Sequence, residues 1–193
     1  MSASQTEVMF KVIEALEQLN SPYLICGSYA SSAHGIARAT MDIDILAAIP
    51  GKQADALAAR LQAEFYADEL AIRRAIETKR SFNLIHLDTM FKVDVFISRN
   101  DPFDVKQLER RRLEIVQRDP KRSAYVASPE DIILAKLRWY RQTNERSERQ
   151  WSDVLGVMNV QADKLDFEYL KHWAIELGVA DLLEGAIAES HGV

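Results

Sequence analysis

Two aspartates alternate with two isoleucines in the segment "MDIDIL", residues 41–46. Side chains along a β-strand point alternately to its two faces, so Asp42 and Asp44 share one face while Ile43 and Ile45 share the other. Like charges this close raise each other's pKa unless a cation lies between them, and carboxylate oxygens suit Mg²⁺ or Mn²⁺. The segment therefore predicts a strand with one buried face and one metal-binding face.

A third acid interrupts another apolar segment, "FKVDVFI", residues 91–97. Asp94 points to the opposite face from Val93 and Val95. If this strand lies beside the "MDIDIL" strand, three carboxylates meet in the arrangement used for two-metal phosphoryl transfer. The alternative is that the acids lie at a sheet edge or form local pairs.

A Gly-Ser pair, Gly27 and Ser28, separates the β-rich segment "YLIC" from the alanine-rich segment "YASSAHG". This order predicts a strand, a tight turn and a helix. Glycine allows a ligand to approach the backbone, and the amides at a helix start favour an anion such as a triphosphate. An ordinary turn is the alternative.

Arg38, four residues before Asp42, either binds phosphate oxygens in a bidentate manner or forms a salt bridge with the acidic pair.

The remaining periodicity up to residue 127 alternates between helix and strand. We expect helices over 6–20, 52–66 and 103–111, and strands at "FNLIHL", "FKVDVFI", "LEIVQ" and "AYVA", with Ala56, Leu57, Leu61 and Phe65 as the buried stripe of the second helix. Together these elements predict an α/β fold in which helices flank a mixed β-sheet.

The last third of the chain predicts helices alone. In "SPEDIILAKLRWYR", residues 128–141, Ser128 is suited to cap a helix and Pro129 to its first position. Two or three further helices are expected over 148–158 and 167–188. We therefore expect two domains, an α/β core over 1–127 and a C-terminal helical region over 128–193 packed on it.

Two polar features of these helices have functional and structural interpretations. Lys136 lies off the apolar stripe of its helix, so its ammonium group is expected to reach past the core toward the acidic strands, the alternative being a solvated surface lysine. Arg149 and Asp153 have the i, i+4 spacing of a local ion pair.

Composition restricts the partners and the compartment. The chain has 193 residues, 48% of them hydrophobic, and a net charge of −5, which argues against general coating of DNA. The densest basic cluster, residues 106–122, is either a phosphate-facing patch or a solvated helix end. One cysteine, Cys26, excludes an internal disulfide, and the four histidines lack zinc-type spacing. No apolar run is long enough to suggest a signal peptide or membrane anchor, so we expect a cytoplasmic protein.

These motifs together resemble a known superfamily. "GS", "MDIDIL" and "KVDVF" are similar to the motifs of the nucleotidyltransferases of the DNA polymerase β type. "GIARATMDIDIL", "FNLIH", "SPEDIILAKL" and "RQWSDVLGVM" resemble, more closely, small bacterial nucleotidyltransferases related to the AbiEii-type toxins. The likeness covers residues 20–158, with Gln150 standing where many relatives have an acid.

The resemblance implies a nucleotidyltransferase fold and a transferase activity that depends on Mg²⁺ or Mn²⁺. Gly27 and Ser28 would hold the nucleotide phosphates, and Asp42, Asp44 and Asp94 would hold two metal ions. Lys136 matches a lysine of the subgroup and would meet phosphate or base. The expected reaction moves a nucleoside monophosphate from an NTP to an acceptor hydroxyl on RNA, a protein or a small molecule. The alternatives are a toxin–antitoxin component that acts by binding its partner chain, and a module that binds a nucleotide without turnover.

Overall fold

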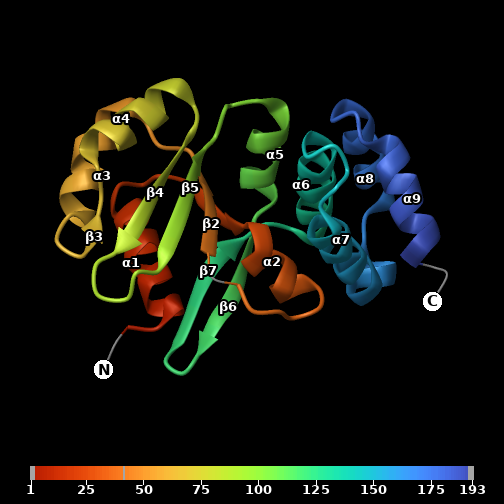
Figure 1. The fold of residues 1–193 in the computed structure, drawn as a ribbon, viewed down its shortest axis with the longest axis horizontal. Coiled ribbons are helices and arrows are strands. Elements are labelled where there is room, and N and C mark those ends of the chain that lie inside the picture. The colour runs from red at the N-terminus through yellow and green to blue at the C-terminus, as the bar shows by residue number, and fades with distance from the viewer. Residues whose placement is uncertain (1–2, 41, 191–193) are drawn as a thin grey trace. The chain divides into compact units, whose positions relative to one another are not determined.

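The computed structural model describes residues 3–40 and 42–190 (Figure 1). Contacts along the chain divide it into two compact units. The sheet unit comprises Met1–Cys26 and Thr40–Val126, and the helical unit comprises Gly27–Ala39 and Ala127–Val193. The helical unit thus contains a short early segment of the chain as well as the C-terminal third.

Seven described strands form one mixed sheet in the sheet unit. They are β1 (Tyr23–Cys26), β2 (Asp42–Ala47), β3 (Phe65–Tyr66), β4 (Ser81–His86), β5 (Lys92–Ile97), β6 (Arg112–Arg118) and β7 (Lys121–Val126). Their order in the sheet is β3-β4-β5-β2-β1-β7-β6. β2 pairs with β5 and β1 with β7 in parallel, whereas the remaining neighbours are antiparallel. The predicted strands are therefore present, and the two acidic strands are neighbours.

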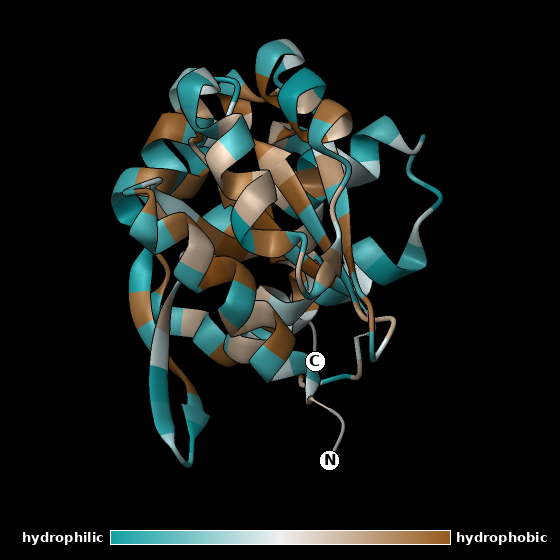
Figure 2. Cartoon of the chain, turned by 90° about the vertical axis from the view of Figure 1, so that its left-hand side faces the viewer, coloured by the Kyte–Doolittle hydropathy of each residue, from teal (hydrophilic) through white to brown (hydrophobic). Residues whose placement is uncertain are grey.

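The apolar sides of β2 and β5 form part of the core. Ile43, Ile45, Val93 and Val95 are at most 1% exposed. Figure 2 shows the inner strands mainly in brown, for hydrophobic residues, while the helices carry both colours. The alternation predicted from the sequence is confirmed, because the residues between these apolar ones lie on the other face of the sheet.

Helices α1 (Gln5–Gln18), α3 (Ala54–Leu61), α4 (Glu69–Thr78) and α5 (Pro102–Arg110) belong to the same unit. α1 starts with a capping box in which the Ser4 hydroxyl accepts from the Glu7 amide and the Glu7 carboxylate accepts from the Ser4 amide. α1 contacts α3, which contacts α4. The predicted helices over 6–20 and 103–111 are confirmed within two residues at each end.

The helix predicted over 52–66 is shorter than expected. A 3₁₀ turn, Gly51–Gln53, precedes α3, which ends at Leu61. Phe65 is buried as predicted, but it lies in β3, where it pairs with His86 of β4. The i, i+4 spacing of Leu61 and Phe65 fits a helix, yet pairing with β4 satisfies the backbone of residues 65–66 instead.

Helix α4 was absent from the sequence prediction although its signals are present. Asp68 caps it by accepting from the Ala71 amide, and Ile72, Ala75 and Ile76 form a buried stripe with helical spacing. Four of the ten residues of α4 are charged, so the apolar stripe is not apparent from the composition of this segment.

The helical unit contains α2 (Gly27–His34), α6 (Pro129–Gln142), α7 (Glu148–Gln161), a 3₁₀ turn (Ala162–Lys164), α8 (Phe167–Glu176) and α9 (Ala180–Ser190). As predicted, Ser128 caps α6, with its hydroxyl 3.2 Å from the Asp131 amide. Of the two or three helices expected over 148–158 and 167–188, the second stretch forms two, α8 and α9, and Gly178 between them adopts a φ of +67°.

Close backbone approach joins α2 to α7. A Cβ atom at Gly35, directly after α2, would lie 2.8 Å from the Val157 amide nitrogen and 2.9 Å from the Gly156 carbonyl carbon. Only glycine fits this contact without displacing backbone. The segment from α2 to Arg38 is therefore held close to α7.

Among residues 3–40 and 42–190, no helix combines the length and the apolar character needed to cross a membrane.

Candidate functional site

The three predicted acids lie on one face of two neighbouring strands. β2 and β5 run parallel in a register that pairs Asp42 with Lys92 and Asp44 with Asp94. Since each strand alternates its faces, the four side chains form a two-by-two grid on the face opposite Ile43 and Val93. The condition set by the sequence, that the two acidic strands be neighbours, is fulfilled.

A lysine lies between two of these acids. The Lys92 ammonium nitrogen is 2.8 Å from Asp94 Oδ2 and 3.9 Å from Asp42 Oδ1. The hydrogen bond to Asp94 is the main reason that the pKa of Lys92 lies above its usual value. Lys92 thus neutralises part of the repulsion among the carboxylates.

The chemistry of the donors fits a divalent cation, because Asp42, Asp44 and Asp94 offer hard oxygen ligands on a single face. The side-chain positions are not those of a completed metal centre. Within residues 3–40 and 42–190, no group of three His, Cys, Asp or Glu side chains has an arrangement that could hold a metal ion. The carboxylates would have to draw together around the ion.

Two further residues on this face were not identified from the sequence. Lys92 precedes Asp94 by two positions, so the period of a strand alone places it on the same face. Asn83 of β4 pairs with Asp94 and is exposed. Its position could not be deduced from sequence spacing, because it depends on how β4 pairs with β5.

Gly27 and Ser28 start helix α2 in the helical unit. Gly27 has a φ of +59°, which lies in the left-handed region that favours glycine. The Ser28 hydroxyl oxygen accepts a hydrogen bond from Arg38 Nη2 at 2.7 Å. A hydroxyl that accepts one bond still has its own proton to donate, so Ser28 retains the donor needed by an anion.

Arg38 is held by an acid that lies 115 residues later in the chain. Its Nε donates to Asp153 Oδ1 at 2.7 Å, and its Nη2 donates to Asp153 Oδ2 at 2.6 Å. The alternative of a salt bridge between Arg38 and the Asp42–Asp44 pair is thus not what forms, because the guanidinium group pairs with Asp153. The guanidinium group also lies against Ser28, so a positive charge is fixed beside the start of α2.

Lys136 also bonds to Asp153. Its ammonium nitrogen lies 2.7 Å from Asp153 Oδ2 and 3.0 Å from Gln150 Oε1. Lys136 is only 5% exposed, so the alternative of a solvated surface lysine is wrong. The expected local pair of Arg149 with Asp153 gives way to these longer-range partners, because α2, α6 and α7 pack together and bring Arg38 and Lys136 to the same carboxylate.

We call Ser28, Arg38, Lys136, Gln150 and Asp153 the Asp153 network. Burial opposes ionisation of Asp153, but hydrogen bonds from Arg38 and Lys136 outweigh it, so the pKa of Asp153 lies below its usual value. Two cations share one carboxylate, and Gln150 contributes an oxygen without a charge. The charged side chains of the network, two cations and one carboxylate, therefore sum to one positive charge.

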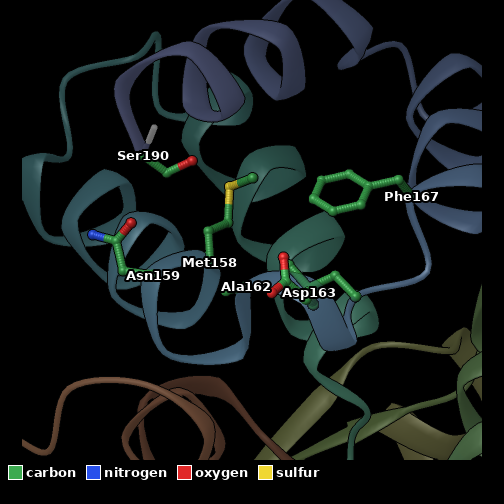
Figure 3. A pocket seen from close by; sticks show the side chains of 7 residues that line it. Met158, Asn159, Ala162, Asp163, Phe167 and Ser190 are labelled. Atoms are coloured by element: carbon green, nitrogen blue, oxygen red, sulfur yellow. The ribbon is translucent and has the colours of Figure 1, made fainter. Parts of the chain in front are cut away.

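The helical unit also contains a pocket of about 410 Å³, shown in Figure 3. It is lined by Met158, Asn159, Ala162, Asp163, Leu165, Phe167 and Ser190. None of the residues predicted to form the site is in this lining. The pocket is thus separate from the Asp153 network.

Comparison with known proteins gives structural matches only. No protein-family model and no curated protein matches the chain. The solution structure of the antibiotic-resistance factor ANT(2'')-Ia covers 99% of this chain and 98% of its own, with a TM-score of 0.57 and 16% identity. The crystal structure of ANT(2'')-Ia in complex with adenylyl-2''-tobramycin covers 91% and 97%, with a TM-score of 0.53 and 13% identity. The chain has the nucleotidyltransferase fold.

A third solved structure agrees with this assignment. An antigenic nucleotidyltransferase-like protein from Paracoccidioides brasiliensis is 18% identical, covers 92% of this chain and 93% of its own, and has a TM-score of 0.50. The fold class expected from the sequence, a mixed sheet flanked by helices with a C-terminal helical part, is confirmed. At identities this low, the likeness shows the fold alone.

Proposed function

We propose that this chain is a metal-dependent nucleotidyltransferase. It transfers a nucleoside monophosphate from an NTP to an acceptor hydroxyl and releases pyrophosphate. In this reaction the acceptor oxygen forms a bond to the α-phosphorus, and the bond from that phosphorus to the β-phosphate oxygen breaks. The hydroxyl proton leaves through Asp94 to solvent.

One observation carries the proposal, the parallel register that pairs Asp44 with Asp94 and places Asp42 on the same face. Three carboxylates at adjacent positions are costly for a sheet unless a cation uses them. In a nucleotidyltransferase fold, a divalent ion bound by these three residues would activate the acceptor hydroxyl and neutralise charge on the triphosphate.

Residues of the helical unit support the proposal because they are suited to bind the phosphates of a nucleotide. Gly27 allows close approach of a ligand, Ser28 offers a hydroxyl proton, and Arg38 places a guanidinium group against Ser28. We propose that Lys136 also contributes to phosphate binding. It shares the Asp153 carboxylate with Arg38, so the two cations together set the charge of the Asp153 network.

The acceptor is the open part of the proposal. ANT(2'')-Ia, which shares the fold, is an antibiotic-resistance factor and has been crystallised with adenylyl-2''-tobramycin. We therefore include a small-molecule antibiotic among the candidate acceptors, next to RNA and protein hydroxyls. The motifs "SPEDIILAKL" and "RQWSDVLGVM" lead us to propose kinship with the AbiEii-type branch as well.

Release of pyrophosphate tests the proposal directly. The pure protein is incubated with Mg²⁺ and each of the four NTPs, together with bulk tRNA, a protein mixture or tobramycin. We expect pyrophosphate with at least one combination, and a decrease on the order of a hundredfold in Asp44→Asn, because loss of one ligand charge weakens stabilisation of the triphosphate. Asp55→Asn, on the exposed surface of α3, is the matched control.

Two results would contradict the proposal. If the protein binds NTP but forms no pyrophosphate with any acceptor, a binding role is favoured over catalysis. Equal rates for the parent and for Asp44→Asn would remove the acidic face from the reaction.

A further inference from the structure

The most specific feature that the proposed reaction does not use is the position of Lys92. Its ammonium group lies between acids of two different strands, with Asp94 on its own strand and Asp42 on β2. Both contacts follow from the sheet, because Asp94 is two residues further along β5 and Asp42 is the cross-strand partner of Lys92. Backbone pairing thus places Lys92 next to both acids on one face of the sheet.

We propose that Lys92 is an internal counter-cation that competes with the divalent metal ion for Asp42 and Asp94. This inference rests on the metal site of the proposed function. In the absence of metal, the ammonium group offsets the repulsion among the three carboxylates. When metal binds, the ammonium group gives up these carboxylates.

The distances explain why the two cations exclude each other. Mg²⁺ holds its oxygen ligands at about 2.0–2.1 Å, whereas Lys92 Nζ lies 2.8 and 3.9 Å from its two carboxylate oxygens. A metal ion that binds both acids draws them closer together than the ammonium group does. The metal ion and the ammonium group would use the same carboxylate oxygens, and their positive charges repel each other.

The lysine side chain is suited to this exchange. The Lys92 side chain is 37% exposed and that of Asp42 is 54% exposed, so the ammonium group can move into solvent when it leaves the acids. A lysine carries its charge on a flexible four-carbon stem, so it can leave without a movement of β5. An arginine would hold the carboxylates by a planar, bidentate fork and would leave less readily.

Titration with Mn²⁺ in the absence of nucleotide tests the competition. We expect Lys92→Met to bind Mn²⁺ about two- to fivefold more tightly than the parent, which is the range of a partly exposed ion pair. Lys92→Arg should bind no more tightly than the parent, because it retains the competing charge. Lys121→Met, an exposed position at the start of β7, changes the net charge by the same amount and should leave the affinity unchanged.

Thermal unfolding provides a second readout that does not involve activity. In EDTA, Lys92→Met should unfold at a lower temperature than Lys121→Met, because three carboxylates then face one another without a counter-cation. Saturating Mn²⁺ should raise the unfolding temperature of Lys92→Met more than that of the parent. Lys92→Gln serves the same two measurements if Lys92→Met does not fold.

The outcomes separate this inference from the proposed function. If Asp94→Asn abolishes Mn²⁺ binding but Lys92→Met binds Mn²⁺ no more tightly than the parent, the competition is refuted and the metal site stands. If Mn²⁺ binding is independent of Asp94 in both the parent and the Lys92→Met background, the metal site fails and the competition fails with it.

Discussion

The Lys136 ammonium nitrogen lies 2.7 Å from Asp153 Oδ2, and both side chains are almost fully buried. The same carboxylate accepts two hydrogen bonds from Arg38. Each of these three charges would be costly to bury alone, so the carboxylate and its two cationic partners stabilise one another only while all three are present. The segment that follows α2 is therefore connected to α6 and α7 through one aspartate.

Removal of Asp153 is expected to destabilise the protein strongly. Asp153→Ala leaves Lys136 and Arg38 without their shared partner, and we expect the free energy of unfolding to fall by about 3–5 kcal/mol. Urea denaturation measures the change. Glu184→Ala, at an exposed position of α9, is the control and should stay within about 0.5 kcal/mol of the parent. A double-mutant cycle with Lys136→Ala should show strong coupling, and additive effects would contradict a direct interaction.

Low pH should reduce the contribution of Asp153 to the stability of the folded protein. Its pKa in the folded protein lies below its usual value, which is about 3.9 in an unfolded chain. Its stabilising effect is therefore fully present above about pH 4 and is lost as the pH falls through the folded pKa. The difference in unfolding temperature between the parent and Asp153→Asn should shrink from pH 6 to pH 3. A difference that stays constant over this range would contradict the assignment.

Ser28 is expected to contribute one hydrogen bond to a bound nucleotide. Ser28→Ala should weaken NTP binding by about 0.5–1.5 kcal/mol, because the backbone amides of α2 still bind the ligand. Isothermal titration with each NTP measures the effect. Ser152→Ala, at an exposed position of α7 in the same unit, should bind as the parent does. If the two variants bind alike, Ser28 is only the residue that Arg38 holds in place.

Gly35 is expected to be essential for packing of α2 on α7. In Gly35→Ala the added Cβ would lie 2.8 Å from a backbone nitrogen, so one helix must shift, at a cost of about 1–3 kcal/mol. Gly51→Ala is the matched control, since a Cβ there meets nothing within 4 Å. Because Arg38 follows Gly35 by three residues, Gly35→Ala should also weaken NTP binding. Unchanged stability of Gly35→Ala would show that the contact can relax.

Local patterns in the sequence were sufficient for most of the elements. The alternation in "MDIDIL" and "KVDVFI" identified two strands and the face that each aspartate occupies, because the side-chain period of a strand is a property of consecutive residues. The cap at Ser128 identified the start of α6 for the same reason. Lys92 was within reach of this reasoning as well, since it lies two residues before Asp94.

Contacts between distant segments could not be obtained in this way. The spacing of Leu61 and Phe65 suits a helix, and only pairing with β4 places Phe65 in a strand. Asp153 has a local partner at the right spacing in Arg149, yet the structure connects it to Arg38, 115 residues away, and to Lys136. Such partners are selected by the free energy of packing whole elements, which no local window of sequence contains.

The sequence by itself therefore determined the local elements and the acidic faces of the strands, since periodicity and capping act between neighbouring residues. The tertiary structure decided which strands became neighbours, with Asp44 beside Asp94, and which cations share Asp153. The physical reason is that strand pairing and helix packing bury surface contributed by segments far apart in the chain. The charges on those segments then bind whichever partners the packing brings within hydrogen-bond distance.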